Sequence, residues 1–516
     1  MDIVELQTDV RAALEDPTLT YRQRMQRLAQ LAENALDPPE VSDACARALD
    51  KRLICDMYEG NAPYRPRYVL PDYAVALANG SAFLELAPPQ DLDEALTHLL
   101  VMYTHVPSIT GYPVYLGDLD KLLAPFVDGV GDDELYRRLR LFWVTLDRVL
   151  PDAFTHTDLG PDDSRVGRTV LRLERELRQV VPNLTLKVDP ARTPDDYLRD
   201  AVETVFACGK PHFVNHPMMT ADLGERYAVV SCYNSLKVGG GSHTLVRLNL
   251  KEVALQHAGS LDRFLDETLP EYVELTAELA EARIRHLVER ARFYDHSWLV
   301  DEGLISLDRF SAMFGVFGLA EAVEVLLAHG GVEARYGHDP VADDLAHRIV
   351  ARVAGLVAAR PMPYCEGNAG RCFLHSQSGI DSDQDVTAGT RVRVGEEPPL
   401  YEHLRAVAPN HRWFASGVSD VLSFDDTARR NPQAVVDVVR GAFREGMRDF
   451  TFNLDSNDFI RITGYLVRKS DLERLPEHGA RHASTLLGAG SVALSHVDRR
   501  AVKRVISLET AAGPGR

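Results

Sequence analysis

The sequence predicts an α/β protein, and three observations support this class. Segments whose apolar residues recur at helical spacing alternate along the chain with short runs of β-branched and aromatic residues. Hydrophobic residues make up 45% of the 516 residues and charged residues 26%, which is enough apolar material for a large core. No repeat, low-complexity tract or clear linker interrupts the chain, so we expect one compact unit.

The first half of the chain is expected to be mainly helical. A strand with a turn is predicted over residues 108–120, and a short apolar strand over 227–231. A glycine-rich loop at Gly239–Gly241 follows, and a second strand is predicted over 243–250. The helices are predicted over residues 1–55, 91–105, 134–150 and 196–208.

The second half alternates long helices with strands. Residues 361–400 are rich in Gly, Pro, Ser and Asp and are expected to form a functional or surface loop. Near the end, strands are predicted over 450–454 and 459–467, joined by a turn at Asp455–Asp458. The helices are predicted over 261–293, 317–329, 341–359 and 432–447, the last with Pro432 in its first turn.

Charge and cysteine content exclude several classes of protein. The net charge is -19, which argues against nucleic acid or an anionic membrane as the main partner, since both need clustered Lys and Arg. No stretch reaches the length of about 18 apolar residues that a membrane span needs. The acidic start lacks the pattern of a signal peptide, so a cytoplasmic location is expected. The six cysteines include no C-x-x-C pair, so neither a bound metal nor a disulfide scaffold is expected.

Gly464 interrupts the β-rich run over 459–467. From spacing alone, such a glycine favours a bulge or a close packing contact. The run Arg461-Ile462-Thr463-Gly464-Tyr465, however, resembles the carboxy-terminal signature of glycyl radical enzymes. A backbone radical needs a planar Cα that conjugates with the amide nitrogen and the carbonyl group. Only glycine provides that carbon without a side chain, so the resemblance implies a stored radical on Gly464.

Cys232 is the candidate for the second radical position. The predicted strand over 227–231 leads to it, Gly239–Gly241 turn the chain, and 243–250 is the expected return strand. Considered alone, the residue fits an inert buried thiol, which is the usual state of free cysteine. The segment is similar to the cysteine loop of anaerobic ribonucleotide reductases, with Arg247–Leu250 in place of a T-I-N-L-like run. The resemblance implies a transient thiyl radical on Cys232 that takes hydrogen from substrate.

The resemblance extends over nearly the whole chain and is closest to the YjjI-type branch of glycyl radical enzymes. It implies a ten-stranded α/β barrel of two antiparallel half-barrels wrapped by helices. Residues 1–430 would form the helical amino-terminal region and the barrel with the cysteine loop, and residues 431–516 the glycine radical domain. The segments that carry the resemblance are Ile54–Met57, Tyr64–Tyr73, 231–250, Phe314–Ala322 and the tail from Asn431.

The resemblance also implies partners. A separate activating enzyme that uses S-adenosylmethionine and an iron–sulfur cluster would install the radical, because nothing in this chain resembles a cluster-binding motif. No cofactor is expected to stay bound to the chain itself, and a homodimer is left open.

Departures from the better-understood branches leave the substrate open. Ser231 and Tyr233 flank Cys232, whereas enzymes similar to pyruvate formate-lyase have two adjacent cysteines. Asn234 stands where eliminases of the family commonly place a glutamate, and an amide cannot act as a general base. The four-cysteine zinc site of anaerobic ribonucleotide reductases is absent. The first hypothesis is a small oxygenated substrate (a polyol, a sugar or a nucleoside-like molecule); the alternatives are a nucleotide reductase and a non-catalytic scaffold.

Three residues are candidates for substrate binding. Asn234 follows the cysteine, His216 lies beside Asn215, and His375 lies in the loop over 361–400. For the two histidines, a satisfied structural role is the more common outcome.

Overall fold

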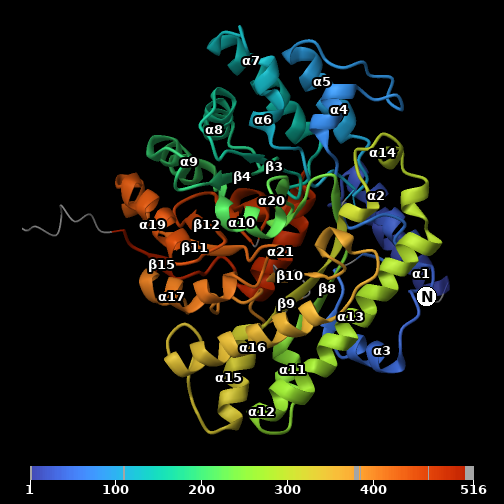
Figure 1. Cartoon of the computed structure of the whole chain (residues 1–516), viewed down its shortest axis with the longest axis vertical. Helices are drawn as coiled ribbons and strands as arrows, with labels where there is room; N and C mark the ends of the chain where they lie inside the picture. Colours follow the sequence, from blue (N-terminus) through green and yellow to red (C-terminus); the bar gives the residue numbers. More distant parts are fainter. Residues whose placement is uncertain are drawn as a thin grey trace, which may run out of the picture.

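The computed structural model describes residues 3–57, 59–108, 111–376, 383, 385–462 and 464–505 (Figure 1). Within these residues the strands form two large sheets and two hairpins. The five-stranded sheet contains β1 (Ile54–Cys55), β2 (Tyr68–Leu70), β8 (Gly240–Asn249), β9 (Phe310–Phe317) and β10 (Phe373–Ser376). The six-stranded sheet has the order β15 (Val502–Lys503), β11 (Asp420–Phe424), β12 (Asp449–Leu454), β5 (His212–Asn215), β4 (Asn183–Val188) and β3 (His156–Leu159).

Each large sheet contains strands of both directions. β8, β9 and β10 are parallel, as are β3, β4 and β5, and β11 is parallel to β12. β12 pairs antiparallel with β5, and β2 pairs antiparallel with β8. Two backbone hydrogen bonds join β10 to the segment that precedes β11: Ser376 N–H donates to Gly417 O over 3.1 Å, and Ser416 N–H donates to Leu374 O over 3.4 Å. The predicted α/β class is confirmed.

Helices surround the sheets (Figure 1). Several begin at a side-chain cap: Thr20 and Gln23 form a capping box, and Asn431 caps the helix that Pro432 opens. In Figure 1, α8, α9 and α19 lie beside the six-stranded sheet, and α11, α13, α15 and α16 lie beside the five-stranded one. The helices are α1 (Ile3–Glu15), α2 (Tyr21–Asn34), α3 (Asp43–Asp50), α4 (Tyr73–Asn79), α5 (Leu92–Tyr103), α6 (Leu119–Leu123), α7 (Asp132–Val149), α8 (Arg165–Leu177), α9 (Asp195–Cys208), α10 (His216–Leu223), α11 (Leu250–Gln256), α12 (Leu261–Arg263), α13 (Leu269–Arg285), α14 (Trp298–Asp301), α15 (Leu319–His329), α16 (Pro340–Ala359), α17 (Leu400–His411), α18 (Asp426–Arg430), α19 (Pro432–Arg444), α20 (Lys469–His478) and α21 (Ala483–Ser495).

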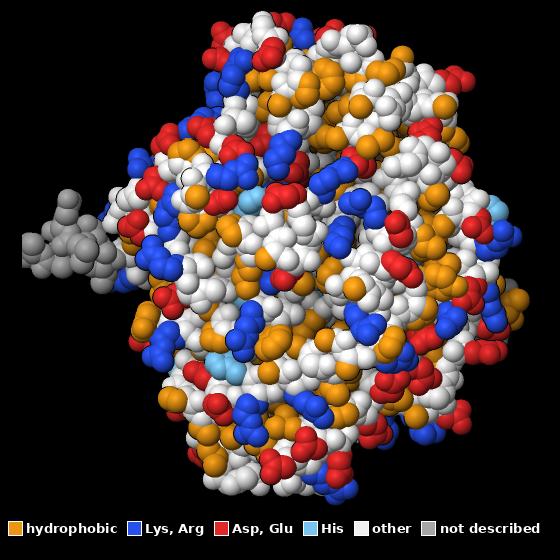
Figure 2. Space-filling model, in the orientation of Figure 1, with side chains coloured by type: hydrophobic (Ala, Val, Ile, Leu, Met, Phe, Trp, Pro, Cys, Tyr) orange, Lys and Arg blue, Asp and Glu red, His pale blue; other side chains and the backbone are white. Residues whose placement is uncertain are grey.

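The central strands are buried on both faces. Every residue of β4, β8, β9 and β12 is buried, which is the pattern expected when helices cover both faces of a sheet. A second, smaller hydrophobic cluster lies apart from the main core and contains Cys208, Cys232, Phe459 and Leu466. On the face shown in Figure 2, acidic and basic side chains are interspersed. None of the described helices combines the length and apolarity required to cross a membrane.

The predicted single strand over 459–467 is wrong. The segment folds back on itself as an antiparallel hairpin of β13 (Phe459–Arg461) and β14 (Leu466–Arg468). Ile462 N–H donates to Tyr465 O over 3.1 Å across the turn. Gly464 therefore lies in a hairpin turn, where the high β propensity of the flanking residues concealed the reversal.

The cysteine loop also differs from its prediction. β6 (Tyr227–Val230) pairs antiparallel with β7 (Asn234–Lys237), so the return strand is β7 and not the segment 243–250. That segment belongs to β8 in the five-stranded sheet. The turn is made by Ser231 and Tyr233, whose φ angles are 51° and 65°, instead of by the glycines. Cys232 thus occupies the tip of a short hairpin.

Several strands were not predicted at all. β3, β4 and β5 carry many polar residues, and β10 lies inside the predicted loop 361–400. The predicted strand over 108–120 includes residues 109 and 110, which lie outside the described residues; Asp118 forms one isolated parallel bridge to Asp158. The division of the chain at residue 430 stays a prediction.

Candidate active site

The tips of the two hairpins meet. Gly464 is so close to Cys232 that an added Cβ would lie 2.1 Å from the Cα of Cys232 and 2.3 Å from its carbonyl carbon. Ordinary carbon–carbon contacts are about 3.5–4.0 Å, so no side chain fits at position 464. Two residues predicted separately from the sequence, 232 positions apart, are therefore in direct backbone contact.

Polar side chains fix the backbone of Gly464. Asn183 on β4 donates from Nδ2 to Gly464 O over 2.8 Å. Its Oδ1 accepts a hydrogen bond from Arg461 Nη1 over 2.9 Å, and the Arg461 guanidinium lies 5.2 Å from the centre of the Tyr233 ring. Arg461 is fully buried, and this burial lowers its pKa. The first residue of the Arg461–Tyr465 signature thus links the glycine hairpin to the cysteine hairpin.

A second buried arginine holds the same turn from the other side. Arg500 Nη1 donates to Arg461 O over 2.8 Å and to Val497 O over 2.7 Å, and its Nη2 donates to Ile462 O over 2.9 Å. Burial lowers the pKa of Arg500 to about 10, so the side chain remains protonated at neutral pH. The segment after α21 therefore supports the backbone just before the glycine.

The cysteine turn is held in a strained conformation. Ser231 and Tyr233 both have positive φ, which costs about 1–3 kcal/mol for a residue with a side chain. Ser419 Oγ donates to Cys232 O over 2.8 Å, and His156 Nδ1 lies 3.3 Å from Ser231 O. Cys232 is 8% exposed. The surrounding contacts thus over-determine where the thiol lies.

Polar groups surround the cysteine hairpin on the side of β2. Asn234 Nδ2 donates to Tyr68 OH over 3.2 Å and to Val230 O over 3.3 Å, while its Oδ1 is buried without a partner among the described residues. Arg67, next to Tyr68, donates to Met57 O over 2.9 Å. A buried amide oxygen without a partner is available to a bound molecule. Asn234 is thus close to the thiol and has a free acceptor.

The two candidate histidines lie in different places. His375 on β10 is fully buried; its Nδ1 lies 2.8 Å from Ser416 O, and its Nε2 has no partner among the described residues. Burial lowers the pKa of His375 to about 4, so the ring is neutral at neutral pH with Nε2 as an acceptor.

His216 opens α10, and its Nδ1 lies 2.9 Å from Tyr227 OH, at the base of the cysteine hairpin. Tyr227 is five positions before Cys232, and Asn215 caps α10, so a role of His216 in substrate binding stays a prediction.

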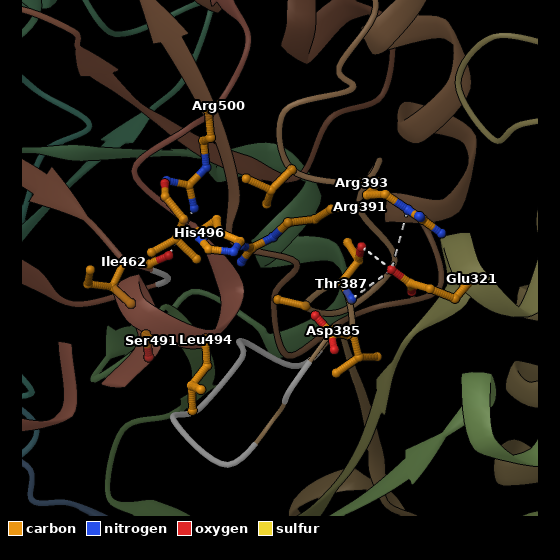
Figure 3. A pocket seen from close by; sticks show the side chains of 14 residues that line it. Glu321, Asp385, Thr387, Arg391, Arg393, Ile462, Ser491, Leu494, His496 and Arg500 are labelled. Carbon is orange, nitrogen blue, oxygen red and sulfur yellow. Dashed lines mark hydrogen bonds and ion pairs between the residues drawn. The ribbon is translucent and has the colours of Figure 1, made fainter. Parts of the chain in front are cut away.

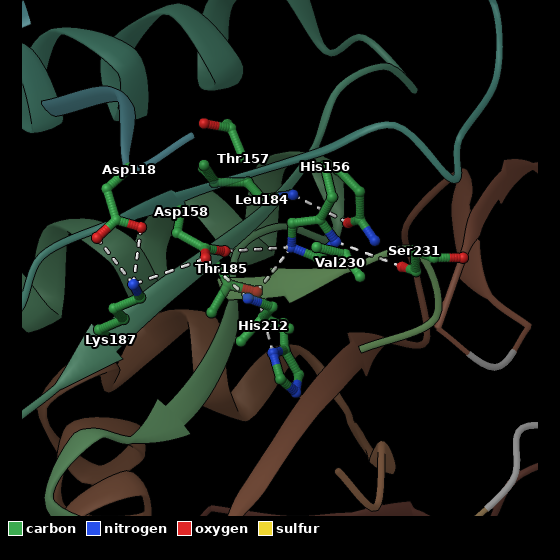
Figure 4. Close-up of polar contacts among 12 residues, drawn as sticks. Asp118, His156, Thr157, Asp158, Leu184, Thr185, Lys187, His212, Val230 and Ser231 are labelled. Carbon is green, nitrogen blue, oxygen red and sulfur yellow. Dashed lines mark hydrogen bonds and ion pairs between the residues drawn. The ribbon is translucent and has the colours of Figure 1, made fainter. Parts of the chain in front are cut away.

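A buried charged cluster lies behind the hairpin and was not predicted (Figure 4). Lys187 Nζ contacts Asp118 Oδ1 at 2.7 Å and Asp158 Oδ2 at 3.7 Å. Asp158 also accepts the backbone N–H of Val229 on β6 over 2.8 Å. Burial raises the pKa of Asp158 to about 8. This cluster anchors β6 to β3 and β4.

A chain of polar side chains continues from that cluster toward the cysteine turn (Figure 4). His156 Nε2 lies 2.7 Å from Thr185 Oγ1, and Thr185 Oγ1 lies 3.2 Å from His212 Nδ1. His212 Nε2 lies 3.4 Å from Asp449 Oδ1, and the His212 ring stacks on Tyr233 with the ring centres 3.6 Å apart. Polar residues on buried strands were the available signal for this network, since such residues must find partners inside the protein.

The fold is similar to that of solved glycyl radical enzymes. The anaerobic ribonucleotide reductase from Thermotoga maritima matches with a TM-score of 0.69 at 13% identity, over 91% of this chain and 92% of that one. The B12-independent glycerol dehydratase from Clostridium butyricum also gives 0.69, at 10% identity over 98% and 89%. The hydroxyproline dehydratase from Clostridioides difficile gives 0.61, at 11% identity over 93% and 88%. At these identities the likeness shows a shared fold.

The sequence comparisons identify the family. Residues 19–503 match the family model described as glycyl radical enzyme YjjI-like. The protein YjjI from Escherichia coli (strain K12) is 47% identical over 505 residues, which covers 98% of this chain and 97% of that protein. A protein from Haemophilus influenzae is 38% identical over 502 residues, 96% and 97% of the two chains. The chain belongs to the YjjI-like family of glycyl radical enzymes, as the resemblance predicted.

Proposed function

We propose that Gly464 stores a radical and that Cys232 passes it to a small oxygenated substrate. The observation that carries the proposal is the backbone contact between the two residues, where no Cβ fits. Inert glycine and cysteine residues have no reason to meet at two hairpin tips. A non-catalytic scaffold needs neither this contact nor the buried arginines and Asn183 that hold it.

The proposed steps conserve hydrogen atoms and electrons. The Gly464 radical takes the hydrogen atom from the Cys232 thiol, which leaves glycine intact and a thiyl radical on sulfur. The thiyl radical then takes a hydrogen atom from a substrate carbon next to a hydroxyl group. The product radical takes that hydrogen back from the thiol, and the restored thiyl radical returns to Gly464. Each step exchanges one S–H bond for one C–H bond of similar strength.

Activation requires a partner in this proposal. A separate radical S-adenosylmethionine enzyme removes one hydrogen atom from the Cα of Gly464, and the process takes place without oxygen. Gly464 is buried, so the glycine hairpin must leave its position while the activating enzyme acts. The smaller hydrophobic cluster supports the proposal of a glycine radical domain over 431–516, because seven of its twelve buried members come from that range, six of them from the glycine hairpin. A cytoplasmic location fits this chemistry.

The proposed substrate class rests on two buried hydrogen-bond acceptors, one on β7 directly after the cysteine turn and one on β10. Asn234 Oδ1 and His375 Nε2 are buried acceptors without partners among the described residues, and acceptors of this kind bind hydroxyl groups. Of the solved relatives, the glycerol dehydratase contains glycerol and the hydroxyproline dehydratase contains trans-4-hydroxy-L-proline. Both ligands carry a hydroxyl group. A polyol, sugar or nucleoside-like substrate is therefore proposed for this chain.

The test is anaerobic incubation of the chain with its activating enzyme, followed by electron paramagnetic resonance and a metabolite screen. A doublet from a glycyl radical and consumption of a hydroxylated metabolite are expected. Ribonucleotides belong in the screen, because reduction of a nucleotide alone would favour the reductase alternative. Absence of any radical in wild-type protein after anaerobic incubation with its activating enzyme would contradict the proposal.

A further inference from the structure

A cavity of about 210 Å³ lies beside the glycine hairpin (Figure 3). Its walls come from the loop 385–394, from α15 and from the end of α21 with the residues after it. Ile462, two positions before Gly464, forms part of the lining. Three arginines line this cavity, Arg391, Arg393 and Arg500, and they differ in how their charges are compensated.

Arg393 is neutralised by its neighbours. Its Nη2 contacts Glu324 Oε2 at 2.7 Å, and its Nε lies 3.8 Å from Glu321 Oε1. Glu321 also accepts from the backbone N–H and the hydroxyl of Thr387. Arg393 therefore adds no unpaired positive charge to the cavity, and Asp385 contributes a carboxylate on the same side.

Arg391 lacks such partners. It is 5% exposed, and its Nε and Nη2 have no hydrogen-bond partner among the described residues. Burial lowers the pKa of Arg391. The carboxylates of Asp420 and Asp449 partly offset this lowering of the pKa by electrostatic attraction. Both have other partners, however: Asp420 pairs with His403 at 3.0 Å, and Asp449 accepts the N–H groups of Val418 and Ser419. A buried guanidinium without a counter-charge is strongly unfavourable.

The charge of Arg500 adds to that of Arg391. Figure 3 shows Arg391 extending toward Arg500 and His496 and away from Glu321. The donors of Arg500 go to three carbonyl groups, which satisfy its hydrogen bonds without neutralising its charge. After burial, the positive charge of Arg391 is the next cause that lowers the pKa of Arg500. Two buried like charges therefore face one cavity.

We infer that this cavity binds an anionic oxyacid group, a phosphate or a carboxylate, through Arg391 and Arg500. Planar guanidinium groups bind such groups through paired, charge-assisted hydrogen bonds. The anion would supply negative charge next to both guanidinium groups, which line the cavity together. Since Arg500 also holds the carbonyls of Arg461 and Ile462, occupancy would stabilise the glycine hairpin. The group belongs either to the substrate or to a separate anion. The inference does not depend on the radical.

The first test is calorimetric titration of the unactivated full-length chain with inorganic phosphate, at constant ionic strength set by chloride. Saturable binding at one site is expected for the wild type. Loss of a charge-assisted contact in R391Q should weaken phosphate binding about tenfold or more. R474Q is the control, because Arg474 is exposed and paired with Asp471 far from the cavity lining. Absence of saturable binding to the wild type, or equal affinity in R391Q, would overturn the inference.

A second test separates a ligand site from a structural arginine. Without phosphate, R391M should have an unfolding midpoint equal to or higher than that of the wild type, because it removes an uncompensated buried charge. With saturating phosphate, the midpoint of the wild type should rise and that of R391M should stay constant. A lower midpoint of R391M in phosphate-free buffer would show that Arg391 is structural and would refute the site.

Two probes distinguish the source of the anion. Glycerol 3-phosphate should bind at least tenfold more tightly than inorganic phosphate if the group belongs to a hydroxylated substrate. Equal affinity would assign the site to a separate anion. Both results support the anion site. If neither probe binds, the inference is overturned. All these measurements use unactivated protein, so failure of the anion site and failure of the radical proposal are distinguishable.

Discussion

Gly464→Ala is the most informative single substitution. The added methyl group would lie 2.1 Å, 2.3 Å and 2.6 Å from three atoms of Cys232, two of them backbone atoms. For the added Cβ and the Cα of Cys232 to reach an ordinary contact distance of about 3.5 Å, the two hairpins must separate by about 1.4 Å. No flexible side chain can move instead, because the nearest atoms belong to the backbone. Overpacking of this kind costs about 1–3 kcal/mol. A displacement of about 1 Å between reacting groups lowers a rate about a hundredfold.

We therefore expect Gly464→Ala to lose the glycyl doublet and all turnover. Hydrogen exchange should increase in residues 459–468 while the main unfolding transition changes little, because the hairpin packs in the smaller hydrophobic cluster. Gly441→Ala is the matched control: nothing lies within 4 Å of its added Cβ, in the interior of α19. That variant should keep the doublet and gain about 0.5–1 kcal/mol of stability. A full-strength doublet in Gly464→Ala would refute the reasoning.

Three further predictions follow from the site. Cys232→Ser should keep the radical on Gly464 and lose turnover, because an alcohol O–H bond is too strong for reversible hydrogen transfer. Cys365→Ala is the control and should stay active. Normal turnover in the serine variant would mean that another residue transfers hydrogen to and from the substrate. Asn183→Ala removes the donor to Gly464 O and leaves buried partners unsatisfied at a cost of about 1–3 kcal/mol, so the doublet should decay faster; an unchanged lifetime would contradict this role. The free energy of unfolding should fall as the pH drops from 6.5 to about 4, because burial lowers the pKa of four histidines to about 4 and the unfolded chain binds protons at these residues first. A flat profile in urea titrations would contradict this. The histidines are His216, His243, His375 and His411.

The two principal residues were predictable because each is anomalous in its sequence context. Gly464 interrupts a run of β-forming residues, and Cys232 follows an apolar strand. Their contact was not predictable from local patterns, because it depends on two hairpin turns. Ser231 and Tyr233, which are not glycines, have positive φ in one turn, and the other turn lies inside a run of β-forming residues. Their joint role came from the resemblance to a family.

The supporting residues were missed for a physical reason. Asn183 contacts Gly464 from 281 positions away, and nothing near Asn183 in the sequence indicates this. The strands β3, β4 and β5 carry buried His156, Lys187 and His212, each of which has a partner on a neighbouring strand. Polar residues at buried positions remove the alternation that identifies a strand. Sequence patterns therefore identified the helices more completely than the strands around the site.

Intact mass of the activated chain after exposure to air tests most directly whether Gly464 holds the radical. Oxygen adds to a backbone carbon radical, and the peroxyl species then breaks the chain at that carbon. The predicted result is two fragments, the longer ending close to Thr463 and the shorter containing the tail, with unactivated protein left whole. An activated chain that stays whole in air, or is cut at a different place, would contradict the assignment of the radical to Gly464.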